Sequence, residues 1–263
     1  LFVGLLASVT AVAQSDFNAG GLFYKITDAV NYKVSVVPEN ATSPYYTTSP
    51  SGDIVIPTTV AHNSVNYTVE SIADHAFDGC TGITSIKLSA ATPYVVNANV
   101  FEGLTLSGIK LIVPQAAKAV YKAAAVWNGF KVVGDAQHVI TITPAVNGTL
   151  TVTNAGANVP TGTSVDDETV LTVNATANPD YQVDSIKAGN VKIANNGTFT
   201  VTEAVTVEAV ISQIPTFIIT INQPAKGTLE VKEGTNVIVS GSPVLEGTVL
   251  TVSATANTGY KLD

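Results

Sequence analysis

The first half of the chain contains the segment Val69-Glu70-Ser71-Ile72-Ala73-Asp74-His75-Ala76-Phe77-Asp78-Gly79-Cys80, which is followed by Ile86-Lys87-Leu88. The same pattern returns as Val100-Phe101-Glu102-Gly103-Leu104, followed by Ile109-Lys110-Leu111. The spacing is 24 residues between the two phenylalanines that share this pattern, and 23 between the isoleucines that open the following runs. A period of this length is typical of a solenoid in which each repeat adds one strand. We therefore expect a short stacked solenoid in this half.

A third strand of this solenoid is expected at residues 54–57, because Ile54-Val55-Ile56-Pro57 resembles Leu111-Ile112-Val113-Pro114. Three repeats are about the minimum for a stacked core, so each end of the stack needs a cap. Residues 23–27 and 32–37 have the composition of two strands joined by a turn. We expect these two strands to form the cap before the first repeat.

The other end of the solenoid is expected to be closed by a single helix over residues 115–127. Pro114 stands at its start, where the missing N–H of a proline costs nothing. The chain is then expected to return as a strand over residues 130–133. The apolar residues that follow the helical period, and so predict the buried face, are Val120, Ala124 and Trp127.

The second half of the chain repeats at an offset of 79 residues without a gap. Ile140-Thr141-Ile142 recurs as Ile219-Thr220-Ile221, and Gly148-Thr149-Leu150 recurs as Gly227-Thr228-Leu229. Residues 171–176 of the first copy alternate between apolar and polar side chains, which predicts a strand buried on one face. Each copy is therefore expected to be an all-β module of short antiparallel strands.

Two Asn-Gly pairs, Asn147-Gly148 and Asn196-Gly197, have the chemistry of two-residue hairpin turns, and we expect hairpins at both. The second copy has no equivalent of residues 185–213 within the sequence. Strands without their partners leave apolar side chains uncovered. We therefore expect four residues of the second copy to be less buried than their counterparts in the first, namely Leu229, Val231, Leu250 and Val252 against Leu150, Val152, Leu171 and Val173.

These patterns predict four segments. Residues 1–13 are apolar or small, and Ala11-Val12-Ala13 fits the cleavage site of a secretory signal peptide, so we expect export. A buried N-terminal strand or helix is the alternative for this segment. Residues 16–134 are expected to form the solenoid with its caps. Residues 138–213 form module 1 and residues 217–263 form module 2, which is truncated.

The composition excludes several classes of function. The net charge is −8, and all 12 basic residues are lysine, so the chain lacks the arginine fork that grips phosphate groups in two places. Nucleic-acid binding and phosphoryl transfer are therefore not expected. Neither a Gly-x-Ser-x-Gly elbow nor a glycine-rich phosphate loop occurs. We expect no enzyme, no cofactor and no membrane insertion of the mature chain.

Few residues are candidates for site chemistry. Cys80 is expected to pack in the core, because Leu104 takes the matching place in the next repeat. His75 is expected at a variable outer position, and three scattered histidines predict no zinc site. The run Asp166-Asp167-Glu168 becomes Leu245-Glu246-Gly247 in the second copy. We therefore expect a solvated charge run there rather than a calcium site, and no metal site in the chain.

The tyrosines are better candidates for binding. Tyr45 and Tyr46 lie in a loop between the first cap strands and the first repeat. Aromatic pairs on loops are enriched at recognition sites, where they stack on sugars or peptides. The alternative is that both tyrosines cover the open end of the solenoid core.

Residues 22–134 resemble the BspA-like leucine-rich repeats of Bacteroides-type surface proteins. The resemblance rests on residues 71–86, which are close to that family's Ile-x-x-x-Ala-Phe-x-x-Cys core, and on the closing Val113-Pro114. Residues 139–211 and 218–263 resemble the divergent InlB B-repeat of bacterial surface proteins through their Gly-Thr-Leu and Gly-Tyr motifs. Both resemblances imply secreted or surface-displayed interaction proteins, some of them adhesins, and neither implies catalytic residues.

We therefore expect a mainly β, secreted or cell-surface adhesion protein. Its leucine-rich-repeat solenoid, with one capping helix, would present a binding face to a host or cell-surface protein or glycan, and the tandem β-modules would act as spacers. The alternative is a carbohydrate-binding or spacer region of a longer secreted enzyme.

Overall fold

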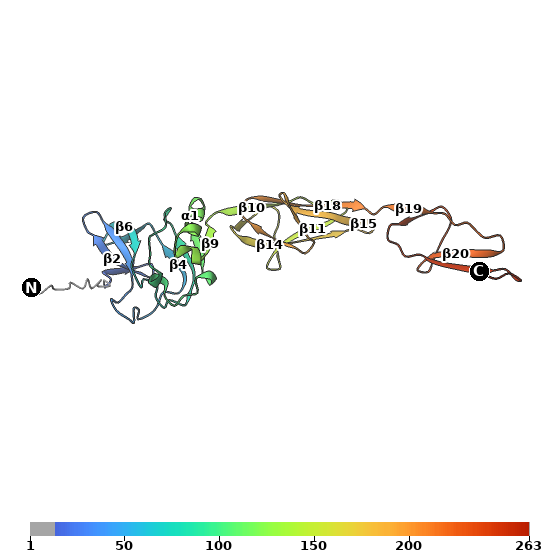
Figure 1. The fold of residues 1–263 in the computed structure, drawn as a ribbon. Coiled ribbons are helices and arrows are strands. Elements are labelled where there is room, and N and C mark those ends of the chain that lie inside the picture. The colour runs from blue at the N-terminus through green and yellow to red at the C-terminus, as the bar shows by residue number, and fades with distance from the viewer. Residues whose placement is uncertain (1–13, 263) are drawn as a thin grey trace, which may run out of the picture. The chain divides into compact units, whose positions relative to one another are not determined.

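The computed structural model describes residues 14–262, so the signal peptide expected at residues 1–13 lies outside the described residues. Strands hold 49% of the described residues and helices 8%, which confirms the mainly β class. The chain forms two compact units (Figure 1). Among the described residues, unit 1 holds residues 14–138 together with 165–168, and unit 2 holds residues 139–164 and 169–262. Within residues 14–262, no helix is long and apolar enough to cross a membrane.

Unit 1 begins with a five-stranded sheet in the order β1-β2-β3-β6-β5. The expected cap strands at residues 23–27 and 32–37 are present as the second and third strands. Strand β3 runs parallel to β6, and the other neighbours are antiparallel. The strands of this sheet are β1 (Phe17–Ala19), β2 (Leu22–Asp28), β3 (Lys33–Val37), β5 (Thr59–His62) and β6 (Val65–Ile72).

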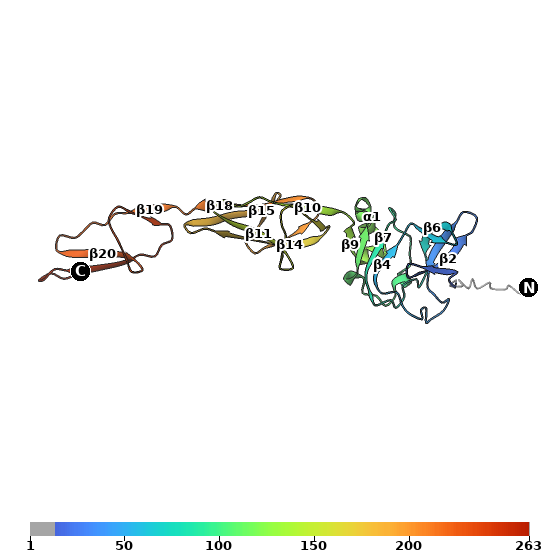
Figure 2. The ribbon, with the colours of Figure 1, turned by 180° about the vertical axis from the view of Figure 1, so that it is seen from behind.

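Unit 1 continues with a four-stranded parallel sheet in the order β4-β7-β8-β9 (Figure 1 and Figure 2). The register sets Ile54 beside Ile86 and Ile86 beside Leu111, so the expected stacking of the three repeat strands is confirmed. All three side chains are buried in one core. The strands of this sheet are β4 (Gly52–Ile56), β7 (Ile83–Leu88), β8 (Lys110–Val113) and β9 (Lys131–Gly134).

The turns before the strands stack in the same way. Phe77 and Phe101 are parallel, with ring centroids 5.6 Å apart, and the Phe77 N–H donates to the Val100 carbonyl at 2.9 Å. Cys80 is fully buried, as expected, and this burial raises the pKa of its thiol to about 12. Leu104 packs against the core but is only partly buried. The 24-residue period therefore places equivalent side chains in adjacent layers.

The closing helix over residues 115–127 was predicted wrongly. The chain forms a 3₁₀ turn at Gln115–Ala117, helix α1 at Lys118–Ala123 and a second 3₁₀ turn at Trp127–Gly129. Ala124 between them is extended, with a ψ of 136°. Further 3₁₀ turns lie at Ala98–Phe101 and Leu106–Gly108.

The buried face of this closing segment also differs from the prediction. Trp127 is fully buried, as predicted, but Val120 is exposed and its neighbour Tyr121 is fully buried instead. The Tyr121 hydroxyl donates to the Ala90 carbonyl at 3.0 Å, and Trp127 Nε1 donates to the Tyr94 carbonyl at 2.7 Å. The two aromatic side chains are thus anchored to the loop at residues 90–94, and these contacts override a regular helical period.

Module 1 consists of two sheets, in the orders β13-β10-β18-β15-β16 and β12-β11-β14-β17. Apolar side chains of both sheets form its core, among them Ile140, Val173 and Val207. The expectation of antiparallel strands alone was wrong, because β10 pairs with β18 in parallel. The strands are β10 (Gln137–Ile142), β11 (Gly148–Asn154), β12 (Ala157–Asn158), β13 (Thr163–Asp166), β14 (Thr169–Ala177), β15 (Tyr181–Ala188), β16 (Val191–Ile193), β17 (Thr198–Val201) and β18 (Val205–Gln213).

The two Asn-Gly turns of module 1 are present, but they do not form hairpins. Asn147 and Asn196 have φ values of 63° and 60°, the left-handed conformation that asparagine tolerates. However, β10 and β11 belong to different sheets, and so do β16 and β17. Each turn therefore carries the chain from one sheet to the other, because the turn chemistry fixes the local bend but not the pairing.

Module 2 repeats part of this arrangement, with β19 paired to β22 and with β20 between β21 and β23. The burial prediction holds for two of its four pairs. Leu250 is only partly buried and Val252 is exposed, whereas Leu171 and Val173 are fully buried. Val231 stays buried like Val152, and Leu229 and Leu150 are both partly buried. The strands are β19 (Thr216–Ile219), β20 (Gly227–Glu233), β21 (Asn236–Ile238), β22 (Ser242–Leu245) and β23 (Thr251–Ala256).

Candidate binding site on the parallel sheet

The parallel sheet of unit 1 has one face in the core and one face outside it. Its strands alternate, so that Ile86 and Leu88 point into the core while Lys87 between them points outward. The register aligns the outward residues of the four strands in two rows that cross the sheet. The first row is Val55, Lys87, Ile112 and Val133, and the second row is Asp53, Ser85, Lys110 and Lys131.

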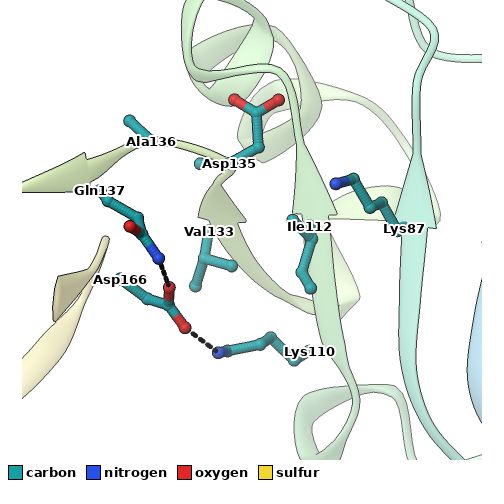
Figure 3. Close-up of a pocket in the computed structure, with 9 residues that line it drawn as sticks. Lys87, Lys110, Ile112, Val133, Asp135, Ala136, Gln137 and Asp166 are labelled. Carbon is teal, nitrogen blue, oxygen red and sulfur yellow. Dashed lines mark hydrogen bonds and ion pairs between the residues drawn. The ribbon is translucent and has the colours of Figure 1, made fainter. Parts of the chain in front are cut away.

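A cavity of about 260 Å³ lies on this outer face (Figure 3). Its aliphatic side chains are Ile112 and Val133, from neighbouring strands of the first row. Strands β7 and β8 contribute the amines of Lys87 and Lys110. The remaining lining comes from the chain just after β9 and from the segment 165–168, both parts of unit 1. Those residues are Gly134, Asp135, Ala136, Gln137 and Asp166.

The polar groups around the cavity are only partly satisfied by one another. Asp166 accepts a hydrogen bond from Gln137 Nε2 at 3.2 Å and faces the Lys110 amine at 3.9 Å. Asp135 Oδ1 accepts the Gln115 backbone N–H at 2.9 Å. Lys87 has no ion-pair partner among the described residues. The cavity thus combines an aliphatic patch with two amines, two carboxylates and one amide, a set able to hold a small hydroxylated or anionic ligand.

The segment beside this cavity contradicts the expected solvated charge run at residues 166–168. Asp167 is fully buried, and its carboxylate contacts the Lys118 amine. It also accepts the Gly134 N–H at 2.8 Å and lies 3.0 Å from His138 Nε2. The Asp167 carboxylate is therefore a buried, hydrogen-bonded group with a structural role. Lysines hold its carboxylates, which leaves no reason to assign calcium there.

The contacts of Asp167 and Glu168 shift the pKa values of both carboxyl groups. Burial alone acts to raise the pKa of Asp167, but the hydrogen bonds from Lys118, Gly134 and His138 outweigh it and lower the pKa to about 2. Glu168 lies 2.7 Å from Lys118 and 3.3 Å from Lys122, and these amines lower the pKa of its carboxyl group. No sequence pattern predicts these contacts, because the lysines lie more than 40 residues away along the chain.

Tyr45 and Tyr46 have different roles in the structure. The Tyr46 hydroxyl donates to the Ala76 carbonyl, its ring packs against the core, and burial raises the pKa of the phenol well above its usual value. Tyr45 instead stacks on the His75 ring, with centroids 4.5 Å apart. Both tyrosines line a cavity of about 230 Å³ together with Ser43, Pro44, Ser49, Asp78 and Gly79.

His75 is half-buried rather than an outer loop position. Its Nδ1 lies 2.7 Å from an Asp78 carboxylate oxygen, and its Nε2 lies 3.4 Å from the amide nitrogen of Asn99. Asn99 is the equivalent of His75 in the next repeat, so the two side chains sit in adjacent layers. His75, Asp78 and Glu102 offer ligand atoms within 4.8 Å of one another, and they are the described residues best placed to hold a metal ion.

Comparison with known proteins identifies part of the chain. Residues 138–215 and 219–263 match the family model of the divergent InlB B-repeat domain, which confirms the resemblance inferred for the second half. This domain is typical of bacterial surface and secreted proteins, in agreement with a cell-surface role. Neither the curated proteins nor the solved structures gave a significant match to the chain. The BspA-like identity of the first half stays a prediction.

Proposed function

We propose that the chain is an interaction region of an exported bacterial surface protein, and that it binds its ligand on the outer face of the parallel sheet. Export would use the signal peptide expected at residues 1–13. The sheet would be a short BspA-like leucine-rich-repeat solenoid, and the InlB B-repeat-like modules would act as spacers. The proposal includes no catalytic step.

One observation carries this proposal, the cavity on the outer face of the sheet. Solenoids bind through such faces, because stacked strands present an extended, rigid surface that needs no deep pocket. Here the rigid core beneath the sheet holds Lys87, Lys110 and Ile112 in register on adjacent strands. A ligand would therefore meet side chains whose backbone positions are already fixed, so that only the side chains themselves are ordered on binding.

The experiment is a binding panel with one charge-reversal variant. The protein is immobilised and exposed in turn to polygalacturonate, hyaluronan, mucin, fibronectin, fibrinogen and collagen. Lys87→Glu reverses an exposed charge on the proposed face, and Lys192→Glu reverses an exposed charge on module 1 as the matched control. We expect at least one panel member to bind wild type and the control alike, and the Lys87 variant at least fivefold more weakly. Equal binding to all three proteins, or no binding, would contradict the proposal.

The cavity beside Tyr45 favours a second candidate, a carbohydrate-binding region of a longer secreted enzyme. It combines aromatic rings with the hydroxyls of Ser43 and Ser49 and with the carboxylate of Asp78, groups that suit a sugar. Tyr45→Ala separates the two candidates. If it abolishes glycan binding while Lys87→Glu leaves that binding unchanged, the second candidate is favoured.

A further inference from the structure

We propose that the cavity on the parallel sheet takes one uronic acid residue of an anionic polysaccharide. This assignment rests on the proposed function, because it names the ligand class of the same face. A uronic acid is a hydroxylated ring with a single carboxylate, and each of these features has a counterpart in the cavity.

The carboxylate of the sugar would lie between the two lysine amines. Lys87 has no ion-pair partner among the described residues, and Lys110 holds Asp166 only at 3.9 Å. Lys131 follows Lys110 in the second row of the same face. Three of the 12 lysines of an acidic chain with a net charge of −8 therefore gather on one sheet face. Asp53, Asp135 and Asp166 lie on or beside the same face, so the three amines give it no net positive charge. The attraction for a carboxylate is therefore local and centred on the Lys87 amine, which pairs with no carboxylate among the described residues.

The two carboxylates of the cavity favour a ligand that carries hydroxyl groups beside its acid group. Asp135 and Asp166 each retain oxygen lone pairs beyond the hydrogen bonds they accept from Gln115 and Gln137. Sugar hydroxyls can donate to these oxygens. A further anionic group on the bound ring, such as a sulfate or a phosphate, would be repelled by them, because like charges this close raise the cost of binding.

The size of the cavity fits a single ring. Its volume of about 260 Å³ is slightly below the range of about 300–1,000 Å³ that is typical of sites for drug-sized ligands. The ring would lie over the half-buried side chain of Ile112, because Val133 beside it is only 2% exposed. Along the same row, Val55 is 53% exposed on the outer strand of the sheet, two strands away from Ile112. The row thus continues beyond the cavity, so a polymer can extend across the sheet.

The test uses calorimetric titration of the full chain with oligogalacturonate, and with the same oligomer fully methyl-esterified. The ester keeps the ring and its hydroxyls but removes the charge. We expect the acid to bind at least tenfold more tightly than the ester, and its affinity to fall as salt is added. Equal affinity of the two oligomers, or no binding of the acid, would overturn the assignment.

Variants locate the site and separate the ligand classes. Lys87→Gln and Lys110→Gln should each weaken oligogalacturonate binding at least threefold, whereas Lys192→Gln should leave it unchanged. Poly-glutamate of equal charge tests whether any carboxylate suffices, and equal binding of that peptide would overturn the choice of a sugar. If oligogalacturonate fails while Lys87→Glu still weakens binding of another panel member, the assignment falls and the proposed function stands.

Discussion

Val173 and Val252 are 79 residues apart and pair with equivalent neighbours, Val152 and Val231, yet Val173 is fully buried and Val252 is 61% exposed. The local strand pairing is therefore the same in both modules. The difference is that the sheet containing β10, β15 and β18 packs over Val173. Among the described residues of module 2, only the strands β19 and β22 lie outside the sheet of Val252. Burial in these modules comes from the facing sheet rather than from the strand itself.

Strand length follows the same rule. The first four residues of β14, Thr169–Thr172, pair with β17. Of their equivalents at residues 248–251, the first three are not in a strand, and β23 begins only at Thr251. Likewise, β10 extends to Ile142 where it pairs with β18, whereas β19 ends at Ile219. The module therefore loses regular structure where a partner strand is missing, since an edge gains little by staying extended.

The Gly-Thr-Leu motif of both modules is explained by a close approach of two backbones, and substitution of its glycine tests this. A Cβ at Gly148 would lie 2.3 Å from the Thr176 carbonyl oxygen, and one at Gly227 would lie 2.5 Å from the equivalent oxygen of Thr255. We expect Gly148→Ala to destabilise module 1 by about 1–3 kcal/mol, measured by urea unfolding. Gly108→Ala is the control, because a Cβ there meets nothing within 4 Å. A loss no larger than that of the control would disprove the packing explanation.

The buried carboxylate of Asp167 predicts a loss of stability in acid. Its pKa is about 2 in the folded protein and near 3.8 when unfolded, so its contribution is complete above about pH 4 and disappears as the pH falls towards 2. A difference of this size corresponds to about 2 kcal/mol. The variant Asp167→Asn should therefore have a lower free energy of unfolding than wild type at pH 7. This difference in free energy should become smaller between pH 4 and pH 2.

The matched control for this measurement is Asp166→Asn, because the neighbouring Asp166 side chain is 63% exposed. It should leave the thermal unfolding midpoint of unit 1 nearly unchanged across the same pH range. A constant gap between Asp167→Asn and wild type at all pH values would show that the carboxylate acts through shape rather than charge.

Cys80 reports on the integrity of the stacked core. Because burial raises the pKa of its thiol to about 12, almost no thiolate exists at pH 8, and the side chain has no exposed surface. We expect Ellman's reagent to modify Cys80 only as fast as the protein unfolds. The rate should rise with urea in parallel with the unfolded fraction. Complete labelling within seconds in the absence of urea would contradict the burial of Cys80 in the stacked core.

Hydrogen exchange compares the two modules within one molecule. Amides at residues 169–171 should be protected, whereas those at the equivalent residues 248–250 should exchange at least a hundredfold faster. Both modules contain one equivalent strand pair, β11 with β14 in module 1 and β20 with β23 in module 2. Amide exchange rates should differ less between these two pairs. Equal protection at both places would mean that module 2 obtains cover from elsewhere.

Periodicity predicted the parts of the fold that depend on local pattern. The strands at Ile54, Ile86 and Leu111 and the burial of Phe77 follow from a repeat in which equivalent residues stack. The closing helix was mispredicted because Tyr121 and Trp127 find hydrogen-bond partners in a distant loop. The Asn147 turn was correct in chemistry and wrong in pairing, because no short segment encodes which sheet its next strand joins.

The candidate site was hidden for a similar reason. Lys87 and Lys110 are ordinary outward residues of their strands, and only the register shows that they face the same cavity. Alternation within β7 was a usable signal, since Lys87 stands between two buried residues. Asp167 had no signal in the sequence, because its partners Lys118 and His138 come from segments that approach it only in the folded chain.

Lysine footprinting tests most directly whether the outer face of the parallel sheet is the binding surface. The protein is acetylated briefly with and without a saturating panel ligand, and the modification of each lysine is read by mass spectrometry. We predict that the bound ligand slows acetylation of Lys87 and Lys110 at least threefold and leaves Lys192 unchanged. Unchanged rates at Lys87 and Lys110 in the presence of a ligand that demonstrably binds would contradict the proposed function.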